Sequence, residues 1–314
     1  MSTFESKNKF LVDNKSTEMR LDNYLLKKFK GVPKSKIYKI IRTGEVRVNS
    51  KRIKPLYKIK EGDLVRVPPN LILDKDSKKK PIKPKNLDWM KDIIISEEDG
   101  FLVLNKPSRI AVHGGSGSRR GLIELLRLQR NNPKEDLELV HRLDKDTSGC
   151  LLISKKRSKL RMLHKYFREG QVDKIYVGLL MGSFQKNEFT VNEPLEINSN
   201  NNLRKAIPSK DGKKAVTKFK LLEKFDGCGL FEIKPITGKT HQIRAHASFI
   251  RKPLAGDQRY NSEPDLLAKR FGLNRLFLHA SSISFPSLED DKNIITYESD
   301  LGKELNDVIS KLRN

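Results

Sequence analysis

The stretch HRLDKDTSG, residues 141–149, leads directly into the apolar run CLLI, residues 150–153. The polar part is rich in turn-forming residues, and the short apolar run that it bounds is typical of a buried strand. Alternate residues of an extended segment lie on the same side. The spacing therefore predicts that Arg142 and Asp144 project together, a guanidinium beside a carboxylate at one locally rigid point.

On either side of this stretch, the sequence alternates strand-like and helical patterns. Apolar runs typical of strands occur at residues 93–95, 102–104, 151–153 and 231–233, and helical spacing occurs at 122–128, 160–167 and 241–250. The strands outnumber the helices and come partly in hairpin order. We therefore predict an α+β domain over residues 91–314, built on a mixed, largely antiparallel sheet.

A smaller α/β unit is predicted over residues 18–68. Helical spacing over residues 21–29 and 33–42 is followed by short strands at 46–48 and 64–67, with a turn at 49–51. Residues 1–17 are polar, and we expect a flexible tail there. The lysine- and proline-rich residues 69–90 predict a basic linker to the larger domain.

The chain is strongly basic, with a formal net charge of +25 over 314 residues. Residues 18–67 hold 15 Lys and Arg against 5 Asp and Glu. Such an excess attracts polyanions and makes their binding sensitive to salt. We interpret the small unit as RNA-binding, with one basic surface that includes Lys34, Lys36, Lys39, Arg42 and Arg47.

Several classes of protein do not fit the sequence. The two cysteines, Cys150 and Cys228, lack metal-ligand spacing and indicate reduced, buried thiols. No signal peptide or apolar run of membrane-spanning length occurs, so we expect a cytoplasmic protein without a membrane partner. His241 and His246 are five residues apart and do not share a helix face, so no metal site is predicted. We expect a monomer.

Three further segments add chemistry to the opening stretch: KIYV at 174–177, TGKTHQIR at 237–244 and NRLFLHA at 274–280. A nucleophilic carboxylate must stay ionised, and a guanidinium favours its charged form, so Arg244 is the candidate partner of Asp144. Tyr176 offers a stacking face for a flat pyrimidine, and Leu278 an apolar wall. Arg142 has the length to fill the space left when a base leaves the RNA stack.

Other interpretations of these residues remain open at this level. Asp144 could instead cap a turn. Tyr176 and Leu278 could instead be ordinary core residues. Asp144 and Asp146 together are also compatible with an N-glycosidase that releases uracil. Without chemistry in the larger domain, the chain would be an RNA-binding assembly factor. The glycine-rich residues 114–117 suggest a phosphate cradle but lack the downstream Gly-Lys-Ser/Thr pattern, so we expect only a tight loop there.

At these motifs the chain resembles the RluA-type pseudouridine synthases. The family's His-Arg-Leu-Asp-x-Asp-Thr-Ser-Gly motif is matched in full by residues 141–149, and its other motifs follow in order at 174–176, 237–244 and 278–280. The N-terminal unit is similar to an S4 RNA-binding domain. The likeness covers about residues 18–290.

The resemblance implies isomerisation of specific uridines in 23S rRNA to pseudouridine, on a pseudouridine synthase fold. It assigns Asp144 as the catalytic nucleophile, Tyr176 as the residue against the base, Arg244 as the partner of the aspartate and Arg142 as the residue that assists extrusion. No electrons or groups enter or leave in that reaction, so the resemblance implies no cofactor.

Overall fold

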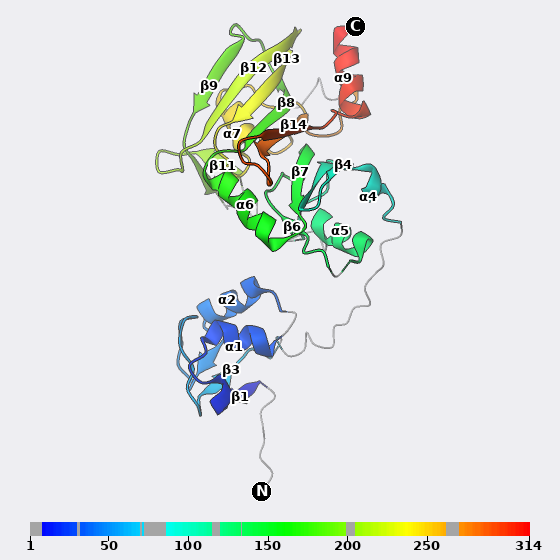
Figure 1. Cartoon of the computed structure of the whole chain (residues 1–314). Coiled ribbons are helices and arrows are strands. Elements are labelled where there is room, and N and C mark those ends of the chain that lie inside the picture. The colour runs from blue at the N-terminus through cyan, green and yellow to red at the C-terminus, as the bar shows by residue number, and fades with distance from the viewer. Residues whose placement is uncertain are drawn as a thin grey trace. The chain divides into compact units, whose positions relative to one another are not determined.

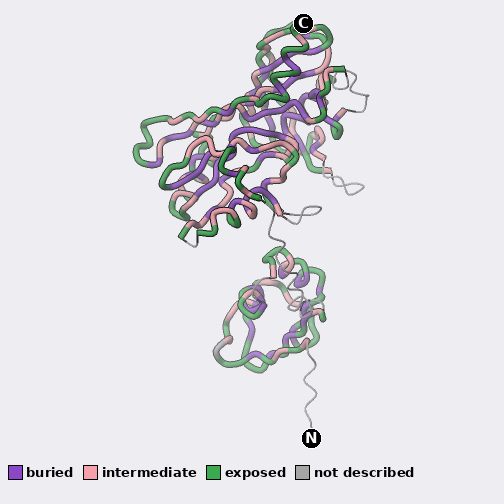
Figure 2. Tube along the Cα trace, turned by 90° about the vertical axis from the view of Figure 1, so that its right-hand side faces the viewer, coloured by how far each residue is buried: buried purple, intermediate pink, exposed green. Residues whose placement is uncertain are grey.

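The computed structural model describes residues 8–29, 32–69, 71, 86–114, 120–132, 134–198, 205–261 and 270–314. Two compact units are present, Met1–Lys85 and Asn86–Asn314 (Figure 1). In each unit the buried residues run along the strands and inner helix faces, and the exposed residues lie mainly on turns (Figure 2). No helix of the described residues is long and apolar enough to cross a membrane.

The first unit packs two helices on one face of a three-stranded sheet. The elements are β1 (Lys9–Leu11), a 3-10 turn (Asn14–Ser16), α1 (Leu21–Lys28), α2 (Lys34–Arg42), β2 (Arg47–Val48) and β3 (Leu64–Arg66), with the sheet order β1-β3-β2. Ile37, Ile40 and Ile41 of α2 pack with Val48 and Val65 of the sheet, as their helical and alternating spacing predicts.

The predicted flexible tail ends earlier than residue 17. β1 pairs antiparallel with β3, Val12 is buried, and the Phe10 ring meets Phe29 edge-on at 5.6 Å between centroids. Two apolar side chains in a polar stretch are thus enough to attach residues 9–12 to the core. Leu71 is buried in the same core, whereas residues 70 and 72–85 of the predicted linker lie outside the described residues.

The second unit is built on one large sheet. Its strands are β4 (Ile94–Glu97), β5 (Phe101–Lys106), β6 (Glu138–Leu139), β7 (Ser148–Ser154), β8 (Asp173–Met181), β9 (Glu188–Asn192), β12 (Val216–Phe225), β13 (Cys228–Pro235), β14 (Leu278–Pro286) and β15 (Ile294–Glu298). The path runs β4-β5-β7-β14-β8-β13-β12-β9, with β15 on β14 and β6 on β7. Only the β7–β14 pair is parallel among the described strands. The prediction of a mixed, largely antiparallel sheet is confirmed.

The remaining elements of this unit are α4 (Trp89–Asp92), α5 (Leu122–Arg130), α6 (Arg157–Arg168), α7 (Gln242–Phe249), α9 (Lys303–Arg313) and the hairpin β10 (Leu195–Asn198) with β11 (Lys205–Pro208). Met90 of α4 is fully buried in the core of this unit. The predicted linker, residues 69–90, was therefore too long at its C-terminal end, because α4 already packs with the core of the second unit. Helix α9 packs Leu305, Val308 and Ile309 against apolar residues of β8 and β13.

The start of β7 brings distant segments together. In the parallel pairing, Gly149 lies opposite Ala280 of β14, with φ of 107°. A Cβ on Gly149 would stand 2.2 Å from the Ala280 carbonyl oxygen, so only glycine allows this approach. The glycine that ends the HRLDKDTSG stretch therefore sets the close contact between β7 and β14.

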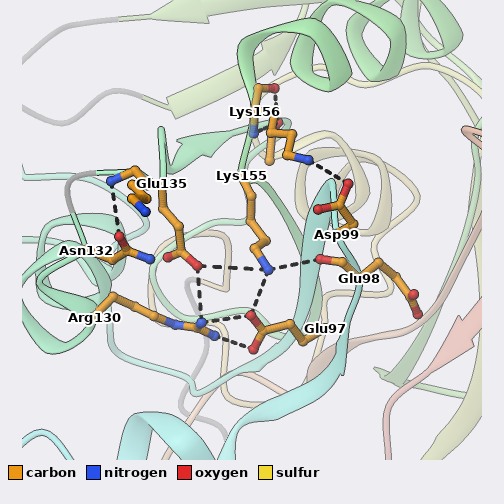
Figure 3. A network of polar contacts seen from close by, with 10 residues as sticks. Glu97, Glu98, Asp99, Arg130, Asn132, Glu135, Lys155 and Lys156 are labelled. Atoms are coloured by element: carbon orange, nitrogen blue, oxygen red, sulfur yellow. Dashed lines mark hydrogen bonds and ion pairs between the residues drawn. The ribbon is translucent and has the colours of Figure 1, made fainter.

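A network of ion pairs fastens β4 to α5 and β7 (Figure 3). Both oxygens of Glu97 accept from Arg130, at 2.8 and 2.6 Å, and Oε1 also accepts from Lys155 at 2.8 Å. Arg130 and Lys155 are largely buried, at 18% and 15% exposure, and both also face Glu135. The hydrogen bonds from Arg130, with help from Lys155, lower the pKa of Glu97 from 4.5 to about 2 despite some desolvation.

This network predicts acid sensitivity of the second unit. Because the folded-state pKa of Glu97 is depressed, its contribution is present above pH 4.5 and is lost as the pH falls toward about 2. The melting temperature, followed by the fluorescence of the single tryptophan Trp89, should fall less steeply over this window in Glu97→Gln than in the wild type. Equal slopes for the two proteins would contradict the role assigned to Glu97.

Candidate active site

One cavity of about 260 Å³ lies at the junction of β7, β8, β14 and the start of α7. Its walls include all five residues that the sequence predicted for catalysis and substrate binding: Arg142, Asp144, Tyr176, Arg244 and Leu278. These residues come from four separate segments of the chain. The volume is close to the lower limit of small-molecule pockets, about 300 Å³, which suits one base or nucleoside.

Asp144 lies in the non-helical segment that enters β7. Leu143 is 4% exposed and points into the core, whereas Arg142 is exposed and Asp144 is 17% exposed. Arg142 and Asp144 both lie on the cavity wall, to which Leu143 between them also contributes. Ser108 fixes the following turn by donating its hydroxyl to the Asp146 carbonyl at 2.7 Å.

A fully buried lysine supports the same turn. The Nζ of Lys106, at the end of β5, donates to the carbonyls of Pro107, Ile110 and Lys145 at 2.7, 2.9 and 3.1 Å. Burial lowers the pKa of Lys106 to about 7. Three carbonyl acceptors satisfy its donors, so Lys106 ties the backbone just after Asp144 to the neighbouring strand.

Tyr176 and Leu278 lie on adjacent strands. Residues 176 and 280 are register partners in the β8–β14 pair, as are 178 and 278. Both side chains are buried, at 8% and 3% exposure, and both reach the cavity. Burial, and to a smaller extent the charge of Asp144, raises the pKa of Tyr176, so its phenol is neutral at pH 7.

The turn before α7 is held in place by Gln242. Its Oε1 accepts from the Thr237 hydroxyl at 2.6 Å and from the Lys239 amide at 3.0 Å, and its Nε2 donates to the Val216 carbonyl at 2.9 Å. His241, the residue before the helix, has the left-handed φ of 53°. The first part of the TGKTHQIR stretch is thus a rigid turn attached to β12. Helix α7 begins directly after this turn, on the cavity wall, and faces Asp144.

Arg244 makes its tight ion pair with a residue that the sequence analysis did not select. Its Nε and Nη2 donate to Asp257 at 2.8 and 2.7 Å, and the side chains are 4% and 0% exposed. The Arg259 and Tyr260 amides donate to the same carboxylate at 3.0 and 3.1 Å. Nη1 of Arg244 lies 3.7 Å from Oδ2 of Asp144. The predicted contact between Arg244 and Asp144 is therefore present, but it is the looser of two.

His241 is the second neighbour of Asp144, with Nε2 3.8 Å from Oδ2. Its Nδ1 lies 3.1 Å from the hydroxyl of Tyr260, which itself accepts from the Ala206 amide at 2.8 Å. Nη1 of Arg259 lies 3.4 Å from Nε2, and a guanidinium can only donate. Nε2 therefore accepts this hydrogen bond, and the proton of the neutral ring is on Nδ1, which donates to the Tyr260 hydroxyl. Burial lowers the pKa of His241, opposed by the charge of Asp144, so the ring is neutral at pH 7.

The predicted RNA-binding residues do not share one surface. Lys34, Lys39 and Arg42 are exposed on α2 and Lys36 is partly exposed there. Lys39 and Arg42 also line a groove with Tyr38 and Arg52. Arg47 instead lies on the face of the sheet that the helices leave uncovered, where Arg66 and Lys9 follow it across the strands.

No group of three or more His, Cys, Asp or Glu side chains suited to a metal ion occurs among the described residues. Residues 115–117 of the glycine-rich loop lie outside the described residues. Asp257, Tyr260 and Lys106 were missed by the sequence analysis. The stretch GDQRY, residues 256–260, carried a usable signal, because an aspartate directly after a glycine is typical of a turn.

Known proteins share this architecture and these motifs. The model of the RNA pseudouridylate synthase family matches residues 100–249, and that of the S4 domain matches residues 19–65. The chain is 46% identical, over 96% of its length and 95% of the relative's, to "Ribosomal large subunit pseudouridine synthase C" of Vibrio vulnificus. It is 43% identical to the protein of the same name from Escherichia coli, over 94% and 93% of the two chains.

Among solved structures, human RNA pseudouridylate synthase domain containing 4 matches with a TM-score of 0.58 and 25% identity, over 71% of this chain and 94% of the human one. The chain belongs to the RNA pseudouridine synthase family, with an N-terminal S4 domain. It is therefore an isomerase, which favours the catalytic interpretation over an RNA-binding assembly factor.

The buried pair predicts a large stability effect. Asp257→Ala leaves the charge of Arg244 buried without its tight partner, which should cost about 3–5 kcal/mol of unfolding free energy. Urea unfolding followed by Trp89 fluorescence measures it. The control is Asp173→Ala, which removes an exposed ion pair with Lys234 and should cost at most about 1 kcal/mol. Similar losses in both variants would contradict the importance of the buried pair.

Proposed function

We propose that this chain isomerises specific uridines to pseudouridine in the RNA of the large ribosomal subunit, 23S rRNA, with Asp144 as the nucleophile. The names and coverage of the relatives support the RNA class. The observation that carries the mechanism is the position of Asp144 on the wall of a small cavity, beside Arg244 and near Tyr176 and Leu278. We expect a monomer.

The target uridine enters this cavity after leaving the RNA stack. Extrusion of a base costs a few kcal/mol, which contacts in the pocket and in the vacated stack offset. Tyr176 and Leu278 supply an apolar pocket for the uracil, with the neutral phenol ring as a stacking face. Arg142, exposed at the edge of the cavity, is long enough to occupy the vacated position in the RNA.

Asp144 acts as the nucleophile in the reaction. The positive charge of Arg244, 3.7 Å away, offsets the cost of holding an ionised carboxylate in a closed cavity. The bond between C1′ and N1 breaks, the uracil turns, and a bond between C1′ and C5 forms. N1 gains a proton and C5 loses one, so the atoms of substrate and product balance. We expect no cofactor, because the reaction transfers no electrons to or from the protein.

Asp144→Asn tests this role while keeping the shape of the side chain. Without a nucleophile, pseudouridine formation should fall by at least about 10³-fold. Carbodiimide-blocked primer extension on large-subunit rRNA, from cells that carry the wild type, the variant or neither, measures it. Filter binding should give an RNA affinity near that of the wild type, so the loss is chemical.

Asp146→Asn is the matched variant in the same turn. The isomerase mechanism needs only Asp144, whereas the N-glycosidase alternative needs both carboxylates and releases free uracil. We expect Asp146→Asn to retain most of the activity, and no free uracil in chromatography of wild-type reactions. Modification that persists in Asp144→Asn, or uracil that accumulates with the wild type, would overturn the proposal.

The N-terminal unit supplies electrostatic affinity for the RNA through α2. Exposed Lys39 and Arg42 line one groove together with Tyr38 and Arg52, a mixture of cations and an aromatic ring that suits RNA. A phosphate contact through a cation contributes about one unit to the slope of log affinity against log salt.

Two paired substitutions in the full chain compare the faces of this unit. Lys39→Gln with Arg42→Gln should reduce the salt slope of rRNA binding by about 2, because two phosphate contacts are lost. Lys9→Gln with Arg66→Gln removes as much charge from the uncovered face of the sheet and should change the slope less. A larger change in the salt slope for Lys9→Gln with Arg66→Gln than for Lys39→Gln with Arg42→Gln would instead place the RNA on the sheet face.

A further inference from the structure

A second cavity, of about 500 Å³, adjoins the candidate active site. Arg244 lines both cavities, so its guanidinium forms part of the shared wall. The other charged residues around the second cavity are Arg109, Asp146, Lys205, Arg259 and Arg275. They come from the loop after β5, the turn after Asp144, β11 and the segments before and after residues 262–269.

The charge of this cavity is unbalanced. Five of its lining residues are cationic and Asp146 is the one carboxylate among the lining residues. Asp257, behind Arg244, already accepts four hydrogen bonds and has little capacity left for other cations. Arg244 is buried and Lys205 and Arg275 are half-buried, and like charges in such positions cost free energy unless an anion compensates them.

Arg275 illustrates the imbalance. Its guanidinium donates to the Ser148 hydroxyl at 2.6 Å and to the Leu276 carbonyl at 3.2 Å. Within the described residues no carboxylate lies within 4.0 Å of it. Burial lowers the pKa of Arg275. The charges of Glu304 and Asp146 oppose this shift, whereas the charge of Arg109 adds to it. Neutral partners thus fix the orientation of this guanidinium, and the carboxylates that act on its charge, Glu304 and Asp146, are not in direct contact with it.

Arg109 is held in place at a conformational cost. Its backbone has φ of 67°, in the left-handed region that an arginine rarely adopts. Its Nη2 donates to the carbonyl of Asn274, which joins the loop after β5 to the residue before Arg275. Strained residues of this kind persist where the surroundings enforce them, and they cluster at binding sites. Arg109 and Arg275 are therefore preorganised.

We propose that this second cavity binds a phosphodiester group of the RNA strand next to the extruded uridine. The inference rests on the proposed function, since it takes the first cavity as the site of the base. Base extrusion rotates a nucleotide about its backbone, so the adjoining phosphates stay close to the pocket. Guanidinium groups bind phosphate through two parallel hydrogen bonds, and Arg109 and Arg275 supply two such groups beside the shared wall.

Binding is measured in the Asp144→Asn background, so that no turnover contributes. The probe is large-subunit rRNA transcribed in vitro, titrated by filter binding from roughly 50 to 500 mM KCl. In Arg109→Gln with Lys205→Gln, the slope of log affinity against log salt should shrink by about 2, one for each lost phosphate contact. The dissociation constant at about 150 mM salt should rise on the order of tenfold.

The matched control is Lys186→Gln with Lys220→Gln, which removes two exposed cations that line neither cavity. Its slope and dissociation constant should equal those of the Asp144→Asn parent. A cavity variant that behaves like this control would overturn the proposal. If the double variant melts early by Trp89 fluorescence, Arg109→Gln alone decides, with a slope change of about 1 expected.

Two further measurements separate this proposal from its alternatives. Calorimetric titration of the wild type with inorganic phosphate should give no binding tighter than about 1 mM, whereas tighter binding that Arg109→Gln abolishes would indicate a site for free anions. Pseudouridine formation is assayed separately with Asp144 intact. An unchanged salt slope with normal pseudouridine formation refutes only the phosphate site. A reduced slope without pseudouridine formation refutes only the proposed function.

Discussion

The buried pair of Arg244 and Asp257 is the interaction on which the rest of the site depends. A charge removed from water is costly unless its partner and hydrogen bonds compensate it, and Asp257 meets this condition with two bonds from Arg244 and two from backbone amides. Since Nε and Nη2 are both engaged, the guanidinium cannot rotate. Nη1 is left facing Asp144, so α7 and the 257–260 turn together define the electrostatics of the cavity.

The central strands supply the second constraint. The parallel contact between β7 and β14 fixes where the HRLDKDTSG stretch enters the sheet, and the antiparallel contact between β14 and β8 sets Tyr176 beside it. Gly149 permits the close approach, and Lys106 ties down the backbone after Asp144. The backbone that follows Asp144 is therefore fixed at residues 145 and 149, and such preorganisation suits the catalysis that we propose.

The cations of this protein have two different tasks. Exposed lysines and arginines on the first unit act over distance and are screened by salt, so they supply attraction without fixing geometry. Arg244 and Arg275, by contrast, are held by short hydrogen bonds in or beside a cavity. A net charge of +25 therefore says little about the site, because the positions of the charges in the site are set by a few buried guanidinium groups.

The sequence by itself determined the local elements and the chemistry of single residues. Apolar spacing gave α1, α2, α5, α6 and α7 and the strands β2, β3, β4, β5, β7 and β13, but not α4 or α9. The motif order gave Arg142, Asp144, Tyr176, Arg244 and Leu278, because periodicity and residue type are local properties. Only the tertiary structure decided which groups are partners. The tight contact of Arg244 with Asp257 and the separation of Arg47 from α2 depend on strand register and on which face each side chain takes. Both depend on the path of the chain between elements and on the pairing of strands, which local spacing does not specify.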